Sequence, residues 1–123
     1  MIRGLRIAAL AAAACAAVAG QPLRADDYPA RPIELIVPFA PGGGSGLVAR
    51  MLSDGLTKRY GQPVIVINRP GGNTNIGTVS VVRSKPDGYT LLVDGVQTHA
   101  INPFVFSKMT YDTQRDLAPV TLL

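Results

Sequence analysis

The residues best suited to chemistry form a glycine-rich turn between two apolar segments. The turn contains Gly42, Gly43, Gly44 and Ser45, and an amphipathic segment begins at Leu47. The first N–H groups of a helix lack acceptors within the helix, and that end carries a partial positive charge. A turn of this kind therefore predicts a site for a carboxylate or a phosphate. The glycines are also compatible with a structural role, because they let the chain reverse closely against a sheet.

Two further loops carry side chains that could bind a polar ligand. One contains Arg69, Asn73, Thr74 and Asn75, and the other contains Thr98. Hydroxyl and amide groups donate hydrogen bonds, and arginine can bind a carboxylate through two parallel bonds. The set is poor in nucleophile–base pairs, which favours a protein that holds an anion over an enzyme. An alternative is that the residues at 73–75 only cap the following helix.

Apolar patterns predict the elements that position these loops. Strands are expected at 33–37, 64–67 and 89–93, and helices at 47–60 and 76–84. Strands alternating with helices predict an α/β fold with a mostly parallel sheet flanked by helices. Ligands of such sheets bind beyond the carboxyl ends of the strands, so the three loops should share one edge.

Each predicted helix should bury one apolar face. The residues expected to point inward are Leu47, Val48, Met51, Leu52 and Leu56 in the first helix, and Ile76, Val79 and Val82 in the second. Gly61 is expected to cap the first helix, and Arg50 to pair with Asp54 across one turn. Arg69, at the edge of the cleft, is then the arginine expected to bind a ligand.

The N-terminus is typical of a secretory signal peptide. Residues 1–25 have a basic start, a short apolar core and small residues before a cleavage point. We expect cleavage after Ala25, with Ala19 as the alternative. A lipid anchor on Cys15 is a weaker interpretation, because Ala12 stands where the motif needs a residue like leucine.

The net charge gives no argument for nucleic acid as a partner. The chain has 12 Lys and Arg against 8 Asp and Glu, but three of the basic residues and none of the acidic ones precede the expected cleavage. The mature part is therefore almost neutral. Its last apolar run, 118–123, has no capping or turn residue after it, so residues 26–123 are expected to be part of a longer chain.

A series of ordered motifs makes the mature chain resemble a known family. The motifs are Tyr28-Pro29, Arg31-Pro32-Ile33, Val37-Pro38-Phe39-Ala40-Pro41-Gly42-Gly43, Ala49-Arg50, Gly61-Gln62-Pro63-Val64, Asn68-Arg69-Pro70-Gly71, Asn75-Ile76-Gly77, Pro86-Asp87-Gly88-Tyr89-Thr90-Leu91-Leu92, His99-Ala100-Ile101-Asn102-Pro103 and Tyr111-Asp112. From Tyr28 onward the chain resembles the periplasmic solute-binding proteins of tripartite tricarboxylate transporters, the Bordetella uptake gene (Bug) family.

The resemblance implies a two-lobed periplasmic-binding-protein fold, similar to type II, of which 26–123 is the N-terminal part of the first lobe and the second lobe is missing. It implies a monomer that closes over a small di- or tricarboxylate or a related organic acid and delivers it to membrane subunits. No cofactor, metal, catalytic residue or nucleic acid is implied. By position, the segments 42–45 and 73–75 should contact the carboxylate, and Thr98 should line the same cleft.

Two departures from the family pattern bear on selectivity. The family usually has an acidic residue directly before the first helix, where this chain has Gly46. Without that side chain, we expect changed selectivity or weaker binding. The second loop, Gly72-Asn73-Thr74, has fewer small residues than is usual, which predicts a narrower and more polar pocket floor.

A dinucleotide site is a rival interpretation from another class of protein. The segment 44–49 fits the fingerprint G-x-G-x-x-[G/A] between a strand and a helix, as in an NADP-type oxidoreductase. However, the second strand ends in Asn68-Arg69 with no acidic residue for a ribose, and Pro38 and Pro41 interrupt the turn.

A third interpretation is a nonfunctional truncated relic of the binding protein.

His99, the only histidine, has no obvious acidic or cysteine partner in the sequence. A structural role is therefore expected for it, and catalysis or metal binding is not.

Overall fold

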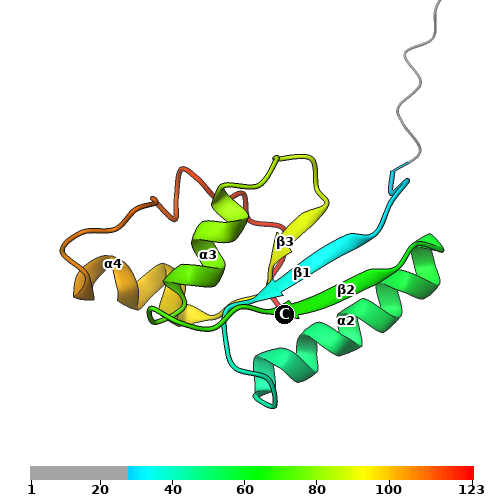
Figure 1. Ribbon diagram of the computed structural model, residues 1–123, viewed down its shortest axis with the longest axis horizontal. Coiled ribbons are helices and arrows are strands. Elements are labelled where there is room, and N and C mark those ends of the chain that lie inside the picture. Colours follow the sequence, from blue (N-terminus) through cyan, green and yellow to red (C-terminus); the bar gives the residue numbers. More distant parts are fainter. Residues whose placement is uncertain (1–27) are drawn as a thin grey trace, which may run out of the picture.

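The structure, a computed structural model, describes residues 28–123, so the predicted signal peptide and its cleavage sites lie outside the described residues. The elements in chain order are β1 (Ile33–Val37), α2 (Gly44–Tyr60), β2 (Val64–Asn68), α3 (Asn75–Val82), β3 (Thr90–Leu92), the π-helical turn η1 (Gln97–Ile101) and α4 (Asn102–Val105) (Figure 1). The predicted alternation of strands and helices is confirmed. None of the helices in this part of the chain is both long and apolar enough to cross a membrane.

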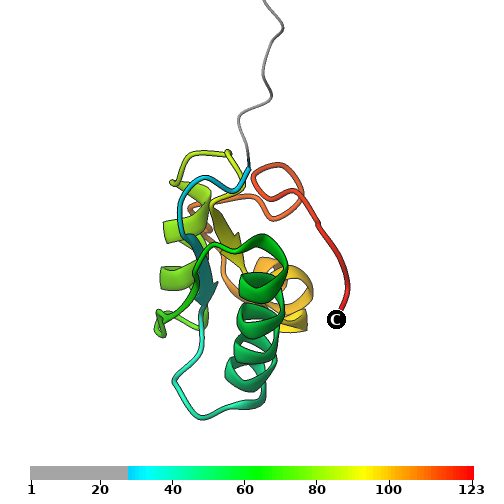
Figure 2. The same cartoon turned by 90° about the vertical axis from the view of Figure 1, so that its right-hand side faces the viewer.

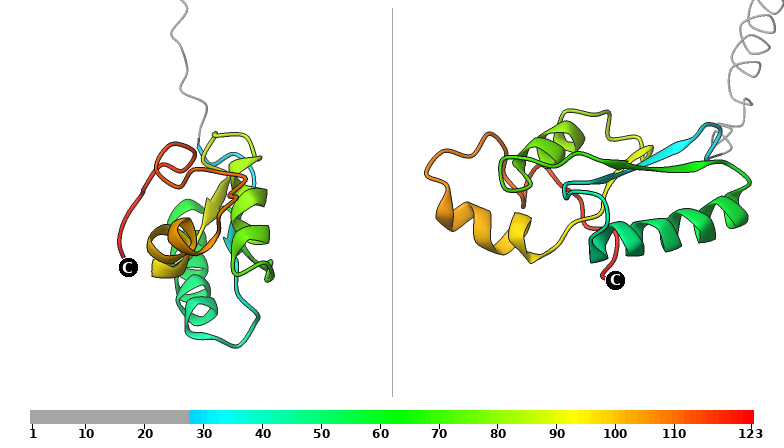
Figure 3. Two further views of the ribbon diagram at one scale, coloured as in Figure 1. Left: turned by 90° about the vertical axis from the view of Figure 1, so that its left-hand side faces the viewer. Right: turned by 60° about the horizontal axis from the view of Figure 1, so that its bottom comes forward.

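The three strands are parallel and form one sheet in the order β2-β1-β3. Ile33 of β1 lies opposite Val64 of β2, and Glu34 lies opposite Thr90 of β3. The central strand is almost continuously buried, as expected for a strand covered on both faces. α2 covers one face of the sheet and α3 covers the other (Figures 2 and 3). The predicted α/β fold with helices flanking a parallel sheet is therefore confirmed.

The strand order creates a switch point between β1 and β3. The chain passes from β1 through α2 to β2, and then returns through α3 to β3 on the other side of β1. α2, which follows β1, and α3, which leads into β3, lie on opposite faces of the sheet (Figure 2). In open α/β sheets, ligands bind in the crevice at such a point.

α2 ends as predicted but buries a different face. Gly61 is its left-handed cap, with a φ of 67°, and the Gly61 N–H donates to a carbonyl of the last turn. Leu47, Val48 and Met51 are all exposed, Met51 at 68%, whereas Ala49 is fully buried in the core. The predicted inward face is therefore wrong in the first turns, and it is right only for Leu52 and Leu56, which pack partly against the core.

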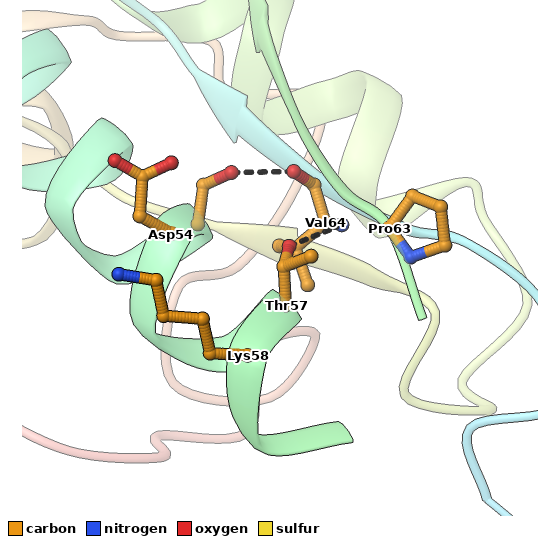
Figure 4. A pocket seen from close by; sticks show the side chains of 6 residues that line it. Asp54, Thr57, Lys58, Pro63 and Val64 are labelled. Atoms are coloured by element: carbon orange, nitrogen blue, oxygen red, sulfur yellow. Dashed lines mark hydrogen bonds between the residues drawn. The ribbon is translucent and has the colours of Figure 1, made fainter. Parts of the chain in front are cut away.

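Two hydroxyl groups that face β2 explain this rotation of α2. Ser53 donates a hydrogen bond to the Val64 carbonyl, and the Thr57 hydroxyl accepts one from the Val64 N–H at 3.0 Å (Figure 4). β2 is an edge strand of the sheet, so these backbone groups need partners outside it. Because residues four apart share a helix face, turning Ser53 and Thr57 toward the strand carries Ala49 inward and Met51 outward.

α3 approaches the loop after β1 closely at Gly77. A Cβ atom on Gly77 would lie 2.7 Å from the Cβ of Pro38 and 2.8 Å from the carbonyl oxygen of Arg69. The predicted inward position of Ile76 is wrong, since this side chain is 58% exposed. The helix turns its smallest residue toward Pro38, and the bulky neighbour is thereby directed outward.

A polar and aromatic cluster fastens the segment before β1 to the turn before β3. Tyr28 donates a hydrogen bond to the Gly88 carbonyl at 2.7 Å, and Arg31 forms an ion pair with Asp87 at 2.9 Å while lying over the Tyr89 ring. The hydrogen bond from the Tyr89 N–H, together with the Arg31 guanidinium, holds the pKa of Asp87 below its ordinary value. The start of β1 is thus fixed at the end of the sheet opposite the switch point.

Candidate functional site

The loops that follow the three strands begin together at the carboxyl edge of the sheet. The Arg69 N–H donates to the Val37 carbonyl at 2.8 Å, and the Val93 N–H donates to the Ile36 carbonyl at 2.9 Å. The Asn68 amide donates to the Phe39 carbonyl at 2.9 Å, which ties the first loop to the second. This edge contains the switch point and is the candidate site.

The first loop presents the uncapped start of α2. Gly43, directly before the helix, is extended and offers no capping side chain, and the first turn has no acidic residue. The first intrahelical bond runs from the Leu47 N–H to the Gly43 carbonyl at 3.2 Å. The N–H groups of the three preceding residues, 44–46, have no acceptor within the helix and are available to an anion.

A small hollow of about 240 Å³ lies at this helix start. Its lining residues are Gly42, Gly43, Gly44, Gly46, Leu47 and Arg50. The predicted pair of Arg50 with Asp54 is wrong, because the ion pairs of the described residues are Arg31–Asp87 and His99–Asp94. Helix side chains lean toward the N-terminus, so Arg50 lies over the preceding turn, and an exposed pair with Asp54 would gain little. Arg50 was predicted to pair with Asp54 along the helix, but it lines the hollow at the start of α2.

The second loop is a left-handed turn. Four consecutive residues have positive φ values: Gly71 at 123°, Gly72 at 55°, Asn73 at 54° and Thr74 at 74°. Glycine and asparagine tolerate this region, but a β-branched threonine rarely adopts it. Thr74 stands directly before α3 and makes no capping hydrogen bond with its side chain. The alternative that this threonine serves as a side-chain cap is not borne out.

The side chains of the second loop bind η1, α4 and the segment after them. The hydroxyls of Thr74 and Thr98 are both buried and lie 2.9 Å apart. Asn73 donates from its amide to Asn102 at 2.7 Å and accepts a hydrogen bond from Gln97. The side-chain oxygen of Asn75 accepts a hydrogen bond from the hydroxyl of the buried Tyr111 at 2.7 Å.

The predicted site residues thus fall into two groups. The segment 73–75 and Thr98 are brought together, whereas Gly42, Gly43 and Gly44 line a separate hollow beside half-buried Ser45. Arg69 is exposed at the start of the second loop. Sequence reasoning missed the central partner of the first group, Asn102, although its motif was visible as Asn102-Pro103.

A larger hollow beside α2 is a poor candidate. Asp54, Thr57, Lys58, Pro63 and Val64 line it, together with Ser53 (Figure 4). It lies at the amino end of β2, away from the switch point, and its two hydroxyls are bonded to the Val64 backbone. Its two charged residues, Asp54 and Lys58, carry opposite charges, so the hollow favours neither an anion nor a cation. The hollow offers no set of groups directed at one kind of ligand.

His99 has an acidic partner that the sequence did not suggest. Its Nε2 lies 3.2 Å from Oδ2 of Asp94, although the geometry is not that of a hydrogen bond. The π-helical turn brings these residues together, so the expectation of no acidic partner is wrong. Across residues 28–123, no three His, Cys, Asp or Glu side chains are grouped as a metal site would need.

The dinucleotide interpretation finds no support in this arrangement. A cofactor ribose would need a free polar side chain at the end of β2. Asn68 is the last residue of that strand, and its amide is bonded to the carbonyl of Phe39 in the first loop. The geometry thus agrees better with a small anion at the glycine-rich turn.

The chain is similar in sequence to known proteins of one family. Residues 48–123 match the model of the tripartite tricarboxylate transporter family receptor. Protein BugT of Bordetella pertussis is 43% identical over 103 residues, which are 83% of this chain and 32% of that protein. The chain therefore spans about a third of the length of the curated relatives it matches.

Solved structures show the same likeness. MatC from Rhodopseudomonas palustris, solved with bound malate, is 34% identical and superposes with a TM-score of 0.69 over 72% of this chain and 30% of that one. A second R. palustris protein, solved with adipate, is 36% identical with a TM-score of 0.68, over 71% of this chain and 29% of that one.

Proposed function

Because the chain belongs to the tripartite tricarboxylate transporter receptor family, we propose that residues 26–123 form the N-terminal part of the first lobe of a periplasmic solute-binding protein. Residues 1–25 direct its export as a cleaved signal peptide. The whole protein closes over a small organic carboxylate and delivers it to the membrane subunits of a transporter. Its role is binding without chemistry.

The observation that carries the proposal is the uncapped start of α2 at the switch point of the sheet. Three free N–H groups, the positive end of a 17-residue helix and Arg50 meet at one hollow. A carboxylate matches this set in charge and size. The relatives solved with malate and adipate are consistent with that choice of ligand.

We assign the binding residues by loop. The backbone of Gly42, Gly43, Gly44 and Ser45 binds one carboxylate group with help from Arg50. The second loop faces the same cleft with the backbone N–H groups of Asn73 and Thr74, and Thr98 supports it. The N–H of Asn75 is bonded to the Gly72 carbonyl, so this residue contributes by ending the turn. Arg69 stands at the cleft edge, where it can reach a second carboxylate.

The proposal is tested by thermal melting of the full-length gene product with a panel of organic acids that includes malate and adipate. A ligand that binds only the folded state raises the melting temperature, and the rise grows with ligand concentration. We expect at least one dicarboxylate to do so. A flat panel together with a response to NADP would instead support the oxidoreductase interpretation.

Gly46→Asp is expected to stabilise the protein by about 1 kcal/mol, because it replaces a helical glycine and puts a negative charge in the first turn. Gly46 is buried, but a Cβ atom there would meet no other atom within 4 Å, so the first atom of the new side chain has room. The introduced carboxylate lies in the hollow proposed for the ligand carboxylate and should repel both acids. It can accept a hydrogen bond from the hydroxyl of malate, so we expect the affinity ratio of malate to adipate to rise.

Urea unfolding and calorimetric titration measure these two effects. The matched control is Gly46→Asn, which has the same shape without the charge. Equal stability of the aspartate and asparagine variants would contradict the helix-dipole explanation. An unchanged affinity ratio would show that position 46 does not face the ligand.

A further inference from the structure

Asn102, at the start of α4, is a fully buried polar residue that the proposed function leaves without a role. Its amide donates to the Asn73 carbonyl at 2.7 Å and to the Thr74 hydroxyl at 3.0 Å. Its Oδ1 accepts from the Asn73 amide at 2.7 Å. All of these bonds join α4 to the second loop, far away in the sequence.

The residues that Asn102 contacts are the ones whose backbone needs support. Gly71 and Gly72 adopt positive φ values without a steric penalty. Asn73 and Thr74 follow them at 54° and 74°, where an L-residue, and a β-branched one above all, is disfavoured. Such a conformation persists only when surrounding contacts hold it, and Asn102 bonds both residues.

We propose that Asn102 is a positioning residue for ligand binding. It holds Asn73 and Thr74 in the left-handed turn and so presents the second loop to the ligand, although it is itself too deeply buried to touch one. This inference rests on the proposed function. Thr98 adds to the restraint through the Thr74 hydroxyl, so η1, α4 and the second loop behave as one unit.

The test compares Asn102→Leu with Tyr111→Phe in the full-length gene product. Both remove hydrogen bonds to the second loop, but Tyr111 bonds only Asn75, which is already helical. Affinity for malate and adipate is measured by calorimetric titration well below both melting temperatures. If the turn survives in one molecule in ten, Asn102→Leu weakens binding about tenfold, because apparent affinity follows the competent fraction. Tyr111→Phe keeps its affinity.

A merely structural role would lower the melting temperature of both variants and leave both affinities unchanged, and that result would overturn the inference.

A rescue variant separates the structural role from the positioning role further. Adding Thr74→Gly to Asn102→Leu supplies a residue that adopts the left-handed region unaided, so part of the lost affinity returns. A further loss in the double variant would contradict the inference.

Hydrogen exchange keeps this inference distinct from the proposed function. The Asn75 and Ile76 N–H groups bond the carbonyls of Gly72 and Gly71 at 3.2 and 3.3 Å and report on the turn without any ligand. If the unaltered protein binds no acid, the proposed function fails. Faster exchange at Asn75 and Ile76 in Asn102→Leu alone would still support a loop-holding role, and unchanged exchange would overturn it.

Discussion

Replacing Gly77 by alanine is expected to lower the free energy of unfolding by about 2–3 kcal/mol, although alanine is the better helix former. The added methyl group would lie 2.7 Å from the Cβ of Pro38 and 2.8 Å from the Arg69 carbonyl oxygen. Pro38 is fully buried and Arg69 is tied to β1 through its N–H, so neither can yield easily. Urea unfolding of the full-length gene product measures the loss.

The matched control for this change is Gly55→Ala. Gly55 lies inside α2, and a Cβ atom there would meet nothing within 4 Å. Alanine should stabilise this position by about 1 kcal/mol through helix propensity alone. Opposite signs for the two variants are the expected result. A Gly77→Ala protein as stable as the unaltered one would mean that α3 lies farther from Pro38 than the structure places it.

Gly77→Ala should also weaken ligand binding, because Pro38 begins the loop that leads to the glycine-rich turn. A displacement of Pro38 moves Gly42 and Gly43 relative to the second loop. Affinity for malate or adipate is therefore expected to fall with stability, whereas Gly55→Ala leaves affinity unchanged. The comparison of Gly77→Ala in α3 with Gly55→Ala in α2 thus tests how closely the packing of α3 fixes the proposed site.

The elements with a continuous apolar signal could be predicted from the sequence. Ile33–Val37 is nearly all apolar, and it is the buried central strand. Gly61 follows the last helical residue, and it is the left-handed cap. The alternation of three strands with two helices was sufficient to predict the parallel sheet and the edge that the three loops share. These features depend on local composition and on general rules of topology.

The features that were missed depend on contacts between distant residues. The periodicity of α2 ranks Leu47 and Met51 as inward, and it contains no information on the bonds from Ser53 and Thr57 to Val64. The network around Asn102 has the same origin, since its partners precede it by more than two dozen residues. The loops of the site could therefore be predicted, but the partners of their side chains could not.

Reversing the charge of Arg50 is expected to weaken binding of malate and adipate at least about tenfold, since an attraction becomes a repulsion at a carboxylate site. Arg50 lines the hollow at the start of α2 and has no ion-pair partner among residues 28–123. The measurement is calorimetric titration of Arg50→Glu in the full-length gene product. The loss should shrink as salt is added, because the hollow is open to solvent.

Arg59→Glu is the matched control, since it makes the same change of charge on the same helix but in its last turn, outside the hollow. It removes a favourable interaction with the helix dipole, so a small loss of stability with unchanged affinity is expected. Arg50→Lys keeps the charge and loses the paired hydrogen bonds, which should give an intermediate affinity. If Arg50→Glu and Arg59→Glu weaken binding equally, the effect belongs to net charge, and the carboxylate does not bind at the start of α2.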